Sequence, residues 1–391
     1  MRLPDFLQLS ILNCSLLVVT SSCIEEYNEL PEQLTDPMVV ITGEIVSGEN
    51  CTFYVTGTSD MQDRPFYVPG SKVSVRGTDG TIFPGTQQDN ETYVVPVGEL
   101  EPDVEYYVMV ENNYGHYRSE PMRPLDAPAI TELVFDQPRP DKVIDFILST
   151  EDPGGPMCFQ WDYEECWEVY TPFTELYACL LDRHDGPDDT FYYSYHFERV
   201  PNDELTNHGW VEHQGNKHFG SNDDYANGAI RRMCLYQGSR TDHRFQTRYR
   251  TLVRQKAITR EEYEYQQLLR QQSTGMGGLF TPMPTELPTN ISYSGEVRGM
   301  GYVGVRGKVS SRELYVRSRD VHYQSLDEPY TVPDTLVESP IKMVQKGYHV
   351  KLYNPYSGEL AWTKKWCVDC RDYYWDYASL ERPRYWIDDP N

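Results

Sequence analysis

The sequence lacks the short motifs by which many enzymes are recognised. It has no Gly-x-Ser-x-Gly nucleophile elbow, no phosphate-binding loop, no dinucleotide-binding glycine fingerprint and no His-Glu-x-x-His zinc helix. Carboxylates are so abundant, with 60 Asp and Glu among 391 residues, that a pair of them at any spacing identifies no active site. We therefore expect a protein that is not an enzyme and that holds no metal and no cofactor.

Positive charge is also scarce. The 35 Lys and Arg leave a formal net charge of −25, so the chain repels phosphate groups and we expect no nucleic-acid partner. Beyond the first 22 residues, no apolar run approaches the roughly 18 residues that a membrane-spanning helix needs.

The first 22 residues carry the pattern of an export signal. Arg2 precedes an apolar stretch from Phe6 to Val19, which is too short to span a bilayer as a helix, and small residues then lead to Cys23. This order predicts a signal peptide over residues 1–22 and lipidation of Cys23. Several acyl chains, at about 0.8 kcal/mol per buried methylene, make such a membrane anchor permanent. The alternative is an ordinary cleaved signal with Cys23 merely close by.

Seven cysteines remain once Cys14 leaves with the signal and Cys23 takes lipid. An exported compartment permits disulfides, but an odd number leaves at least one thiol unpaired or intermolecular. The spacing of Cys367 and Cys370 is compatible with a structural disulfide, half a zinc site or a redox pair. A zinc site lacks a second ligand pair at a suitable spacing, and a redox pair needs a helix start after a strand. We favour a disulfide between these two residues.

The N-terminal part predicts a tether followed by a sandwich. Residues 23–36 are polar and acidic, which suits a lipidated tether. Over residues 37–124, short strands alternate between turns, and Leu100-Glu-Pro102-Asp-Val-Glu-Tyr106 resembles the tyrosine corner of immunoglobulin-like and fibronectin type III sandwiches. In that corner the Tyr hydroxyl bonds to upstream backbone. Prolines at positions 121–140 predict a boundary just after residue 124.

Residues 125–391 predict a larger β-rich domain, which we expect to be a second β-sandwich with one inserted helix. Phe159-Gln-Trp161-Asp-Tyr163 alternates cleanly, as a half-buried strand does. Thr259-Arg-Glu-Glu262 has the form of a capping box, so a helix is predicted from residue 259 to about 272.

One predicted strand, from His243 to Lys256, has two different faces. Phe245, Tyr249 and Val253 share an apolar face. The basic face carries Arg244, Arg248, Arg250, Arg254 and Lys256. Two interpretations remain open: salt bridges inside the protein, which we favour, or a strip that binds an anion or a partner.

Five histidines lie between residues 184 and 218, in a segment rich in Asp, Asn and Gly. They are His184, His196, His208, His213 and His218. Histidine ligates transition metals and acidic loops hold calcium, but these spacings match no known site. We interpret residues 182–228 as long exposed loops around one strand at Phe191–Phe197.

Motifs in the second half carry a family resemblance. In chain order they are Ile258-Thr-Arg-Glu-Glu-Tyr-Glu-Tyr, Gly277-Gly-Leu-Phe280-Thr-Pro282-Met-Pro284, Asn290-Ile, a strand at Gly299–Val305, Cys367-Val-Asp-Cys370 and Pro383-Arg-Tyr-Trp386. With the lipid site and the N-terminal sandwich, the chain resembles the domain of unknown function 4249 family, uncharacterised lipoproteins of Bacteroidota. Thr289 departs from the family's Gly, and residues 371–377 replace a glycine-rich stretch. The resemblance implies an outer-membrane lipoprotein, often encoded beside a TonB-dependent receptor.

Our leading hypothesis is a surface-exposed, non-enzymatic outer-membrane lipoprotein that assists a TonB-dependent barrel in nutrient uptake. In such bacteria, acidic residues after the lipidated Cys favour display on the cell surface, and Glu25-Glu26 fit that pattern. The alternative is a stand-alone glycan-binding or adhesin-like module. Its 31 Tyr and 7 Trp suit sugar or peptide surfaces. A third hypothesis, an unrecognised hydrolase, requires a pocket with converging carboxylates.

Overall fold

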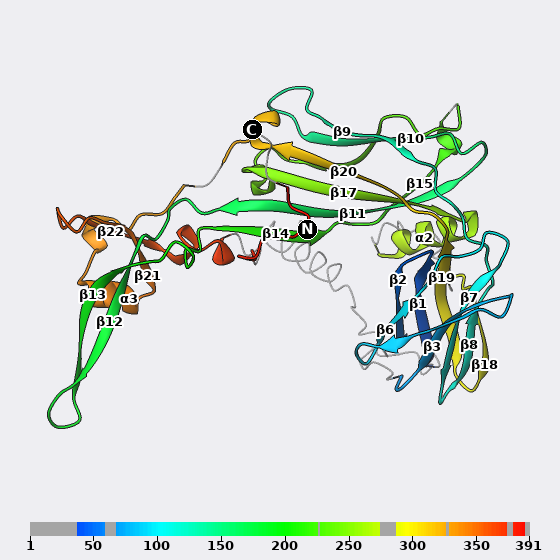
Figure 1. Cartoon of the computed structure of the whole chain (residues 1–391), viewed down its shortest axis with the longest axis horizontal. Coiled ribbons are helices and arrows are strands. Elements are labelled where there is room, and N and C mark those ends of the chain that lie inside the picture. Colours follow the sequence, from blue (N-terminus) through cyan, green and yellow to red (C-terminus); the bar gives the residue numbers. More distant parts are fainter. Residues whose placement is uncertain are drawn as a thin grey trace, which may run out of the picture.

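The computed structural model is built almost entirely from strands, in three bodies that follow one another in space (Figure 1). We refer to them as the sandwich, the central body and the distal lobe. The mainly β fold confirms the prediction from the sequence. The structure describes residues 37–58, 68–225, 227–273, 287–325, 328–373 and 378–387.

The predicted signal peptide and tether, including Cys23, lie outside the described residues. Within the described residues, every helix is too short or too polar to cross a membrane.

The sandwich consists of two five-stranded sheets. The first has the order β19 (Arg298–Arg306), β1 (Met38–Val46), β2 (Asn50–Gly57), β6 (Thr92–Pro96) and β5 (Thr86–Gln87). The second has the order β18 (Ile291–Gly295), β8 (Gly115–Ser119), β7 (Tyr106–Asn112), β3 (Lys72–Gly77) and β4 (Ile82–Pro84).

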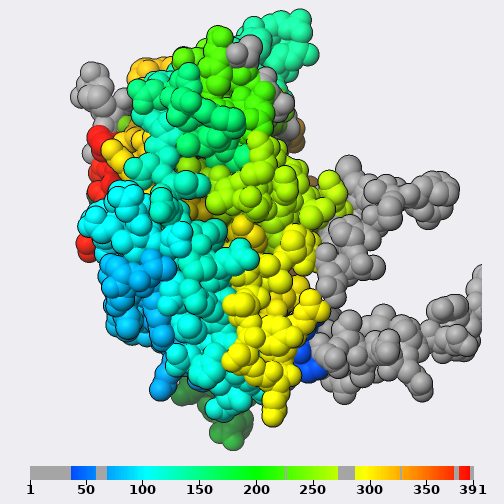
Figure 2. Space-filling view, turned by 90° about the vertical axis from the view of Figure 1, so that its right-hand side faces the viewer, coloured from blue at the N-terminus to red at the C-terminus, as the bar shows by residue number. Residues whose placement is uncertain are grey.

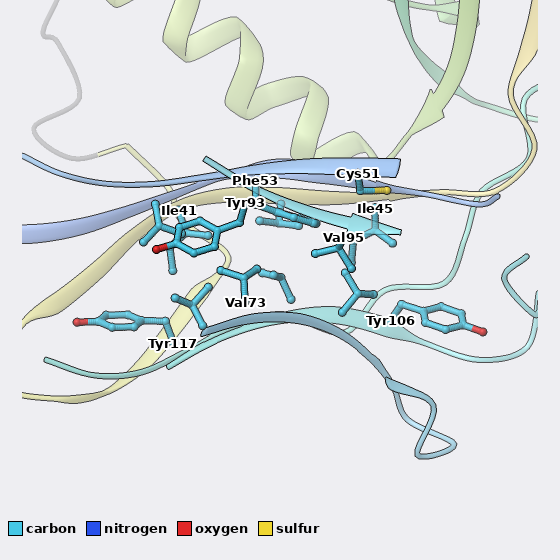
Figure 3. Packing of buried hydrophobic residues seen from close by; sticks show 14 of the residues in the cluster. Ile41, Ile45, Cys51, Phe53, Val73, Tyr93, Val95, Tyr106 and Tyr117 are labelled. Atoms are coloured by element: carbon cyan, nitrogen blue, oxygen red, sulfur yellow. The ribbon is translucent and has the colours of Figure 1, made fainter. Parts of the chain in front are cut away.

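Both sheets turn their apolar side chains inward, and these meet in a closed core (Figure 3). Its residues include Ile41, Phe53, Val73 and Val95. Tyr106 is buried at the start of β7, and its hydroxyl accepts a hydrogen bond from the backbone N–H of Glu101 at 3.0 Å. This contact confirms the predicted tyrosine corner, which fixes where the chain crosses between the sheets.

Two strands of the sandwich come from late in the chain. β19 pairs in parallel with β1, with Gly299 opposite Val39, and β18 pairs with β8. Figure 2 shows this late segment, in yellow, beside the cyan part of the sandwich. At Gly301, φ is +119° and a Cβ would lie 2.0 Å from the Ile41 carbonyl oxygen, so only glycine fits the pairing. The sandwich therefore extends beyond the predicted range 37–124, because a parallel pairing between distant segments leaves no local pattern.

The central body is a second sandwich. Its larger sheet has the order β14 (His208–Gln214), β11 (Cys158–Tyr170), β17 (Arg248–Ile258) and β20 (Ser310–Arg317), with β15 (His218–Ser221) also paired to β11. The facing sheet has the order β16 (Met233–Gly238), β10 (Ile144–Thr150) and β9 (Ile130–Asp136). Phe146, Phe159, Trp161 and Tyr249 are buried between the two sheets.

The basic strand predicted from His243 begins only at Arg248. Residues His243–Phe245 form a 3-10 turn instead, because the Asp242 carboxylate accepts a hydrogen bond from the Arg244 N–H at 3.0 Å and caps it. The inserted helix α2 (Arg260–Ser273) follows β17 as predicted, and the Thr259 hydroxyl accepts the N–H of Glu262 at 3.1 Å. A second, short helix, α3 (Pro340–Gln345), was not predicted.

The distal lobe surrounds a small core of five buried residues: Cys179, Val332, Met343, Val350 and Trp362. It contains α3, the hairpin of β21 (Tyr348–Tyr353) with β22 (Leu360–Lys364), and the hairpin of β12 (Tyr177–Asp185) with β13 (Phe191–Arg199). The β12–β13 hairpin, which we call the arm, projects away from the lobe in Figure 1.

The strand predicted at Phe191–Phe197 lies within β13, but the interpretation of the rest of residues 182–228 as long loops was wrong. The end of β12 and strands β13, β14 and β15 occupy much of that segment. The arm is exposed on both faces near its tip, so its strands carry polar residues where a half-buried strand would be apolar, and the alternation that signals a strand is lost.

Candidate ligand-binding cleft

A cleft of about 480 Å³ is lined by residues of the sandwich, of the central body and of α2. Figure 1 shows α2 at the junction of these two bodies. The outer side of β1 and β2 forms one wall, and β17 and the start of β11 form another. Clefts between domains are a common place for ligand sites, because two rigid bodies supply their side chains to one space. Neither body alone encloses this cleft.

Arg306 at the end of β19 is the most buried charge of the cleft, with its side chain only 2% exposed. Its guanidinium forms a two-pronged pair with Glu262 of α2, in which Nη1 lies 2.9 Å from Oε2 and Nη2 bonds to Oε1. Its Nε lies 3.7 Å from Glu44 Oε2, beyond hydrogen-bond distance, and donates to nothing in the described structure. Burial by itself lowers the pKa of Arg306, but the carboxylates of Glu262 and Glu44 raise it above its ordinary value.

Lys256 on β17 is the second buried cation. Its Nζ lies 2.5 Å from Glu44 Oε1 and 2.5 Å from Asp162 Oδ2, so it bridges the sandwich to the central body. Burial raises the pKa of the Glu44 carboxyl, but the charges of Lys256, Arg306 and Lys217 outweigh this and hold it at about 2. Glu44 is thus ionised at any physiological pH.

The mouth of the cleft combines charges with tyrosine rings. Arg254 pairs with Glu49 across the two bodies. Tyr265 of α2 stacks on Tyr302 of β19, with ring centroids 4.9 Å apart and an interplanar angle of 25°. Tyr54 on β2 is 50% exposed. Tyr265 is itself only 7% exposed, so the lining presents both signs of charge together with the more accessible rings of Tyr54 and Tyr302.

The cleft offers little for covalent chemistry. In the part of the chain that the structure describes, no Ser or His lines it. Burial raises the pKa of the Cys51 thiol to about 11, so this thiol stays protonated at neutral pH and is a weak nucleophile. Each of the carboxylates Glu44, Glu49 and Glu262 is held by a cation. Such a site is suited to binding.

Four of the five residues on the predicted basic face, including Arg244 just before β17, are paired within the protein, which confirms the favoured interpretation. The ion pairs are Arg244 with Glu165 and Asp242, Arg250 with Glu313, Arg254 with Glu49, and Lys256 with Glu44 and Asp162. Arg248 instead lies over the ring of Tyr315, 4.4 Å from its centroid. Only Arg254 and Lys256 of this face line the cleft.

The five histidines are dispersed over four strands. Three make polar contacts: His184 with Ser194 at 2.7 Å, His196 with Asp182 at 2.9 Å and His213 with Glu165 at 3.0 Å. The rings of His208 and His218 lie beside those of Tyr170 and Tyr163. Among the described residues, no group of three or more His, Cys, Asp or Glu is placed to hold a metal ion.

Cys367 and Cys370 are free thiols in the structure, as are the other five described cysteines. Cys370 packs into the core of the central body, and burial raises its pKa to about 11. The Cys367 sulfur instead lies 3.9 Å from the Tyr330 carbonyl oxygen. The two side chains thus have different surroundings, and the disulfide between them is not formed here and stays a prediction.

Three residues that build the cleft, Glu44, Glu262 and Arg306, were not identified from the sequence. Glu262 already had a local explanation in the capping box. Arg306 carried a weak signal, since an arginine closes the otherwise apolar strand pattern that begins at Gly299. Glu44 is one of 60 acidic residues and carried none.

Comparison with known proteins places the chain in a family without a described activity. The model of the domain of unknown function (DUF4249) matches residues 24–312. None of the curated proteins matches the chain.

Two solved structures show partial likeness. The adhesin InvE of Yersinia pseudotuberculosis is 15% identical, with 56% of this chain and 55% of that chain covered and a TM-score of 0.15. A DUF4785 family protein from Legionella pneumophila is 9% identical, with 56% and 52% covered and a TM-score of 0.18. The chain spans just over half the length of these structures, and scores this low carry no argument about function.

Proposed function

The chain belongs to the domain of unknown function 4249 family, and we propose that it is a surface-exposed, non-enzymatic outer-membrane lipoprotein that binds a small ligand for a TonB-dependent transporter. The cleft between the sandwich and the central body carries the binding part of this proposal. Its side chains come from both bodies, and its charges are paired with one another.

The chemistry of the cleft favours a short peptide as the ligand. A peptide brings an ammonium group, a carboxylate and apolar side chains. Glu49 and Arg254, which pair with each other in the structure, can exchange that pair for the charged ends of a peptide, and the exposed ring of Tyr54 can contact an apolar side chain. A neutral glycan carries no charged groups that could pair with the carboxylates and cations of the cleft. The glycan-binding alternative remains an outcome of the test below.

The anchor and the transporter rest on the sequence. The small residues before Cys23 support lipidation, and the family resemblance supports a TonB-dependent partner. The test is a gentle-detergent pull-down of the tagged protein from its own outer membranes, with mass spectrometry of the proteins that co-purify. We expect a TonB-dependent barrel in stoichiometric amount. Recovery of the protein alone, or its protection from protease added to intact cells, would contradict the proposal.

The ligand class is tested with the lipidated full-length protein in detergent. The protein is incubated with a casein hydrolysate, washed, and analysed for retained peptides by mass spectrometry. Tyr54→Ala at the mouth should reduce retention, whereas Tyr356→Ala, a 99% exposed tyrosine on the distal lobe, should not. Retention of maltodextrins in place of peptides, without any barrel partner, would instead favour the glycan-binding module.

A further inference from the structure

The arm is a hairpin with an open edge. β12 and β13 pair in one unbroken register, from Tyr177 opposite Arg199 to Asp185 opposite Phe191, with no bulge. In the described residues they pair with no third strand, so the outer edge of β13 is free of backbone partners.

The hydrogen bonds that flank the arm show which residues face this open edge. The N–H of Gly186 donates to the Thr190 carbonyl at 2.8 Å, and the N–H of Val200 donates to the Leu176 carbonyl at 3.0 Å. Hydrogen-bonded pairs alternate along an antiparallel ladder, so the even-numbered residues of β13 bond to β12. The odd-numbered residues, Phe191 to Arg199, therefore direct their N–H and C=O groups outward.

From Phe191 to Phe197 this edge carries little of the usual protection, and the charged residues Glu198 and Arg199 stand only at its end. Proteins guard open strand edges with Lys, Pro, bulges or very short strands, because an open edge is a template for another strand. β13 is nine residues long and contains neither Lys nor Pro. It is also apolar for an exposed strand, with Phe191 54%, Tyr192 61% and Tyr195 45% exposed.

The rings along the edge do not form a platform for a sugar. Phe191 and Tyr193 lie at 79° to each other with centroids 5.8 Å apart, and Tyr195 and Phe197 lie at 79° with centroids 5.9 Å apart. A flat sugar ring needs a flat aromatic face, whereas edge-to-face rings make ridges into which another row of side chains fits. One face of the Phe197 ring is covered by Tyr353 of the distal lobe, with centroids 4.0 Å apart and an interplanar angle of 17°. The rings of Phe191, Tyr193 and Tyr195 stay available and suit a protein strand.

We propose that this strand is β13 of a second copy of the chain, paired antiparallel about a two-fold axis at Tyr195. This register places Tyr195 opposite the partner's Tyr195, Tyr193 opposite the partner's Phe197 and Phe191 opposite the partner's Arg199. All of these are odd-numbered residues, so their outward backbone groups meet, and all nine residues of the strand are paired.

The strand itself suits a second copy, because the two-fold register pairs aromatic with aromatic residues at its centre and its local charge permits the contact. Two chains of net charge −25 repel each other, so contact is favourable only where local charge is balanced. β13 carries one Glu and one Arg. In the two-fold register Glu198 faces the partner's Tyr192 and Arg199 faces the partner's Phe191, so no like charges are opposed. The two arms then form a four-stranded sheet with its aromatic rows on one face. This dimer is independent of the proposed ligand and transporter.

Cysteine cross-linking tests the register. Residues opposite each other in a hydrogen-bonded pair have Cα atoms about 5.5 Å apart, within the range of about 4.4–6.8 Å that a disulfide spans. Tyr195→Cys, made in a Cys234→Ser background to remove the exposed thiol, should give a covalent dimer on oxidation. Tyr192→Cys is the matched control. It is more exposed, but its two copies would lie about 20 Å apart. Failure of Tyr195→Cys to cross-link, or equal cross-linking of Tyr192→Cys, would overturn the proposal.

Light scattering of the full-length protein in detergent tests the association itself. We expect a dimer for the natural sequence and at least tenfold weaker association for Tyr195→Lys, which places two ammonium groups at the axis. The exposed position tolerates Lys, and circular dichroism checks that the variant is folded. If the natural sequence is a monomer at every concentration, the proposed dimer is wrong. The proposed function would be unaffected, because it is tested separately by the co-purification of a barrel and by the retention of peptides.

Discussion

The central body is joined to its two neighbours by different chemistry. At the sandwich, side-chain charges cross the junction: Lys256 to Glu44, Arg254 to Glu49 and Arg306 to Glu262. At the distal lobe, backbone groups carry much of the contact. The N–H of Phe173, just after β11, donates to the carbonyl of Cys367, just after β22, at 2.9 Å.

The difference shows where each junction is vulnerable. A buried ion pair is stabilising only while both partners are present and ionised, since the loss of one leaves the other charge unpaired. A backbone hydrogen bond does not depend on side-chain identity. The sandwich junction should therefore respond to single substitutions and to acid, and the distal junction should respond less.

The largest effect is expected from Arg306→Met. The variant leaves Glu262 buried without its partner, and we expect a loss of about 3–5 kcal/mol in the free energy of unfolding. Urea denaturation measures this loss. The control is Arg76→Met on β3. Its ion pair with Glu111 is far more exposed, with side chains 31% and 36% exposed against 2% and 4% for Arg306 and Glu262, so its loss should cost less than about 1 kcal/mol. Similar losses in the two variants would show that the junction is held by something other than this pair.

Acid should weaken the sandwich junction through Glu44. Its pKa is held at about 2, against an ordinary value of 4.5 that an unfolded chain would have. A lowered folded-state pKa adds stability that is complete above the unfolded value and is lost as pH falls from about 4.5 towards 2.

Glu44→Gln should therefore be less stable than the natural protein at pH 7, and the gap should narrow as pH drops below 4.5. Urea unfolding of both proteins between pH 7 and pH 3 measures the gap. A gap that stays constant across this range would mean that the Glu44 charge does not contribute.

A smaller effect is expected from Thr259→Ala. Thr259 caps α2, and α2 carries Glu262 into the junction. Loss of the cap should cost about 0.5–2 kcal/mol. Thr335→Ala, at an exposed turn of the distal lobe, is the control and should change stability by less than about 0.5 kcal/mol. An equal loss of unfolding free energy in both variants would show that the Thr259 cap does not stabilise the junction.

The sequence predicted features that depend on a few neighbouring residues. The tyrosine corner at Tyr106 and the cap at Thr259 are each made within five residues, so spacing alone is enough. The two faces of β17 were also predicted, because a strand alternates whatever its partners are.

The features that the sequence did not predict depend on partners far away in the chain. The pair of Arg306 with Glu262 spans 44 residues and joins two bodies, so no local pattern connects the two residues. The arm was predicted only in part, since the strand expected at Phe191–Phe197 lies within β13 but residues 182–185, the end of β12, were expected in a loop. A two-stranded hairpin has no core of its own to impose an apolar face, and its Tyr, His and Asp residues resemble those of a loop.

The parallel pairing of β1 with β19 also determines when the sandwich can be completed during synthesis. Val39 leaves the ribosome long before its partner Gly299, which is 260 residues later (299 − 39). Until then the first sheet of the sandwich lacks its edge strand β19, and β1 has no partner on that side. Contacts between such distant residues form slowly, and the exposed strand makes the chain prone to aggregation meanwhile. A chain that stops short of residue 298 is thus left with an open sandwich as well as a truncated one.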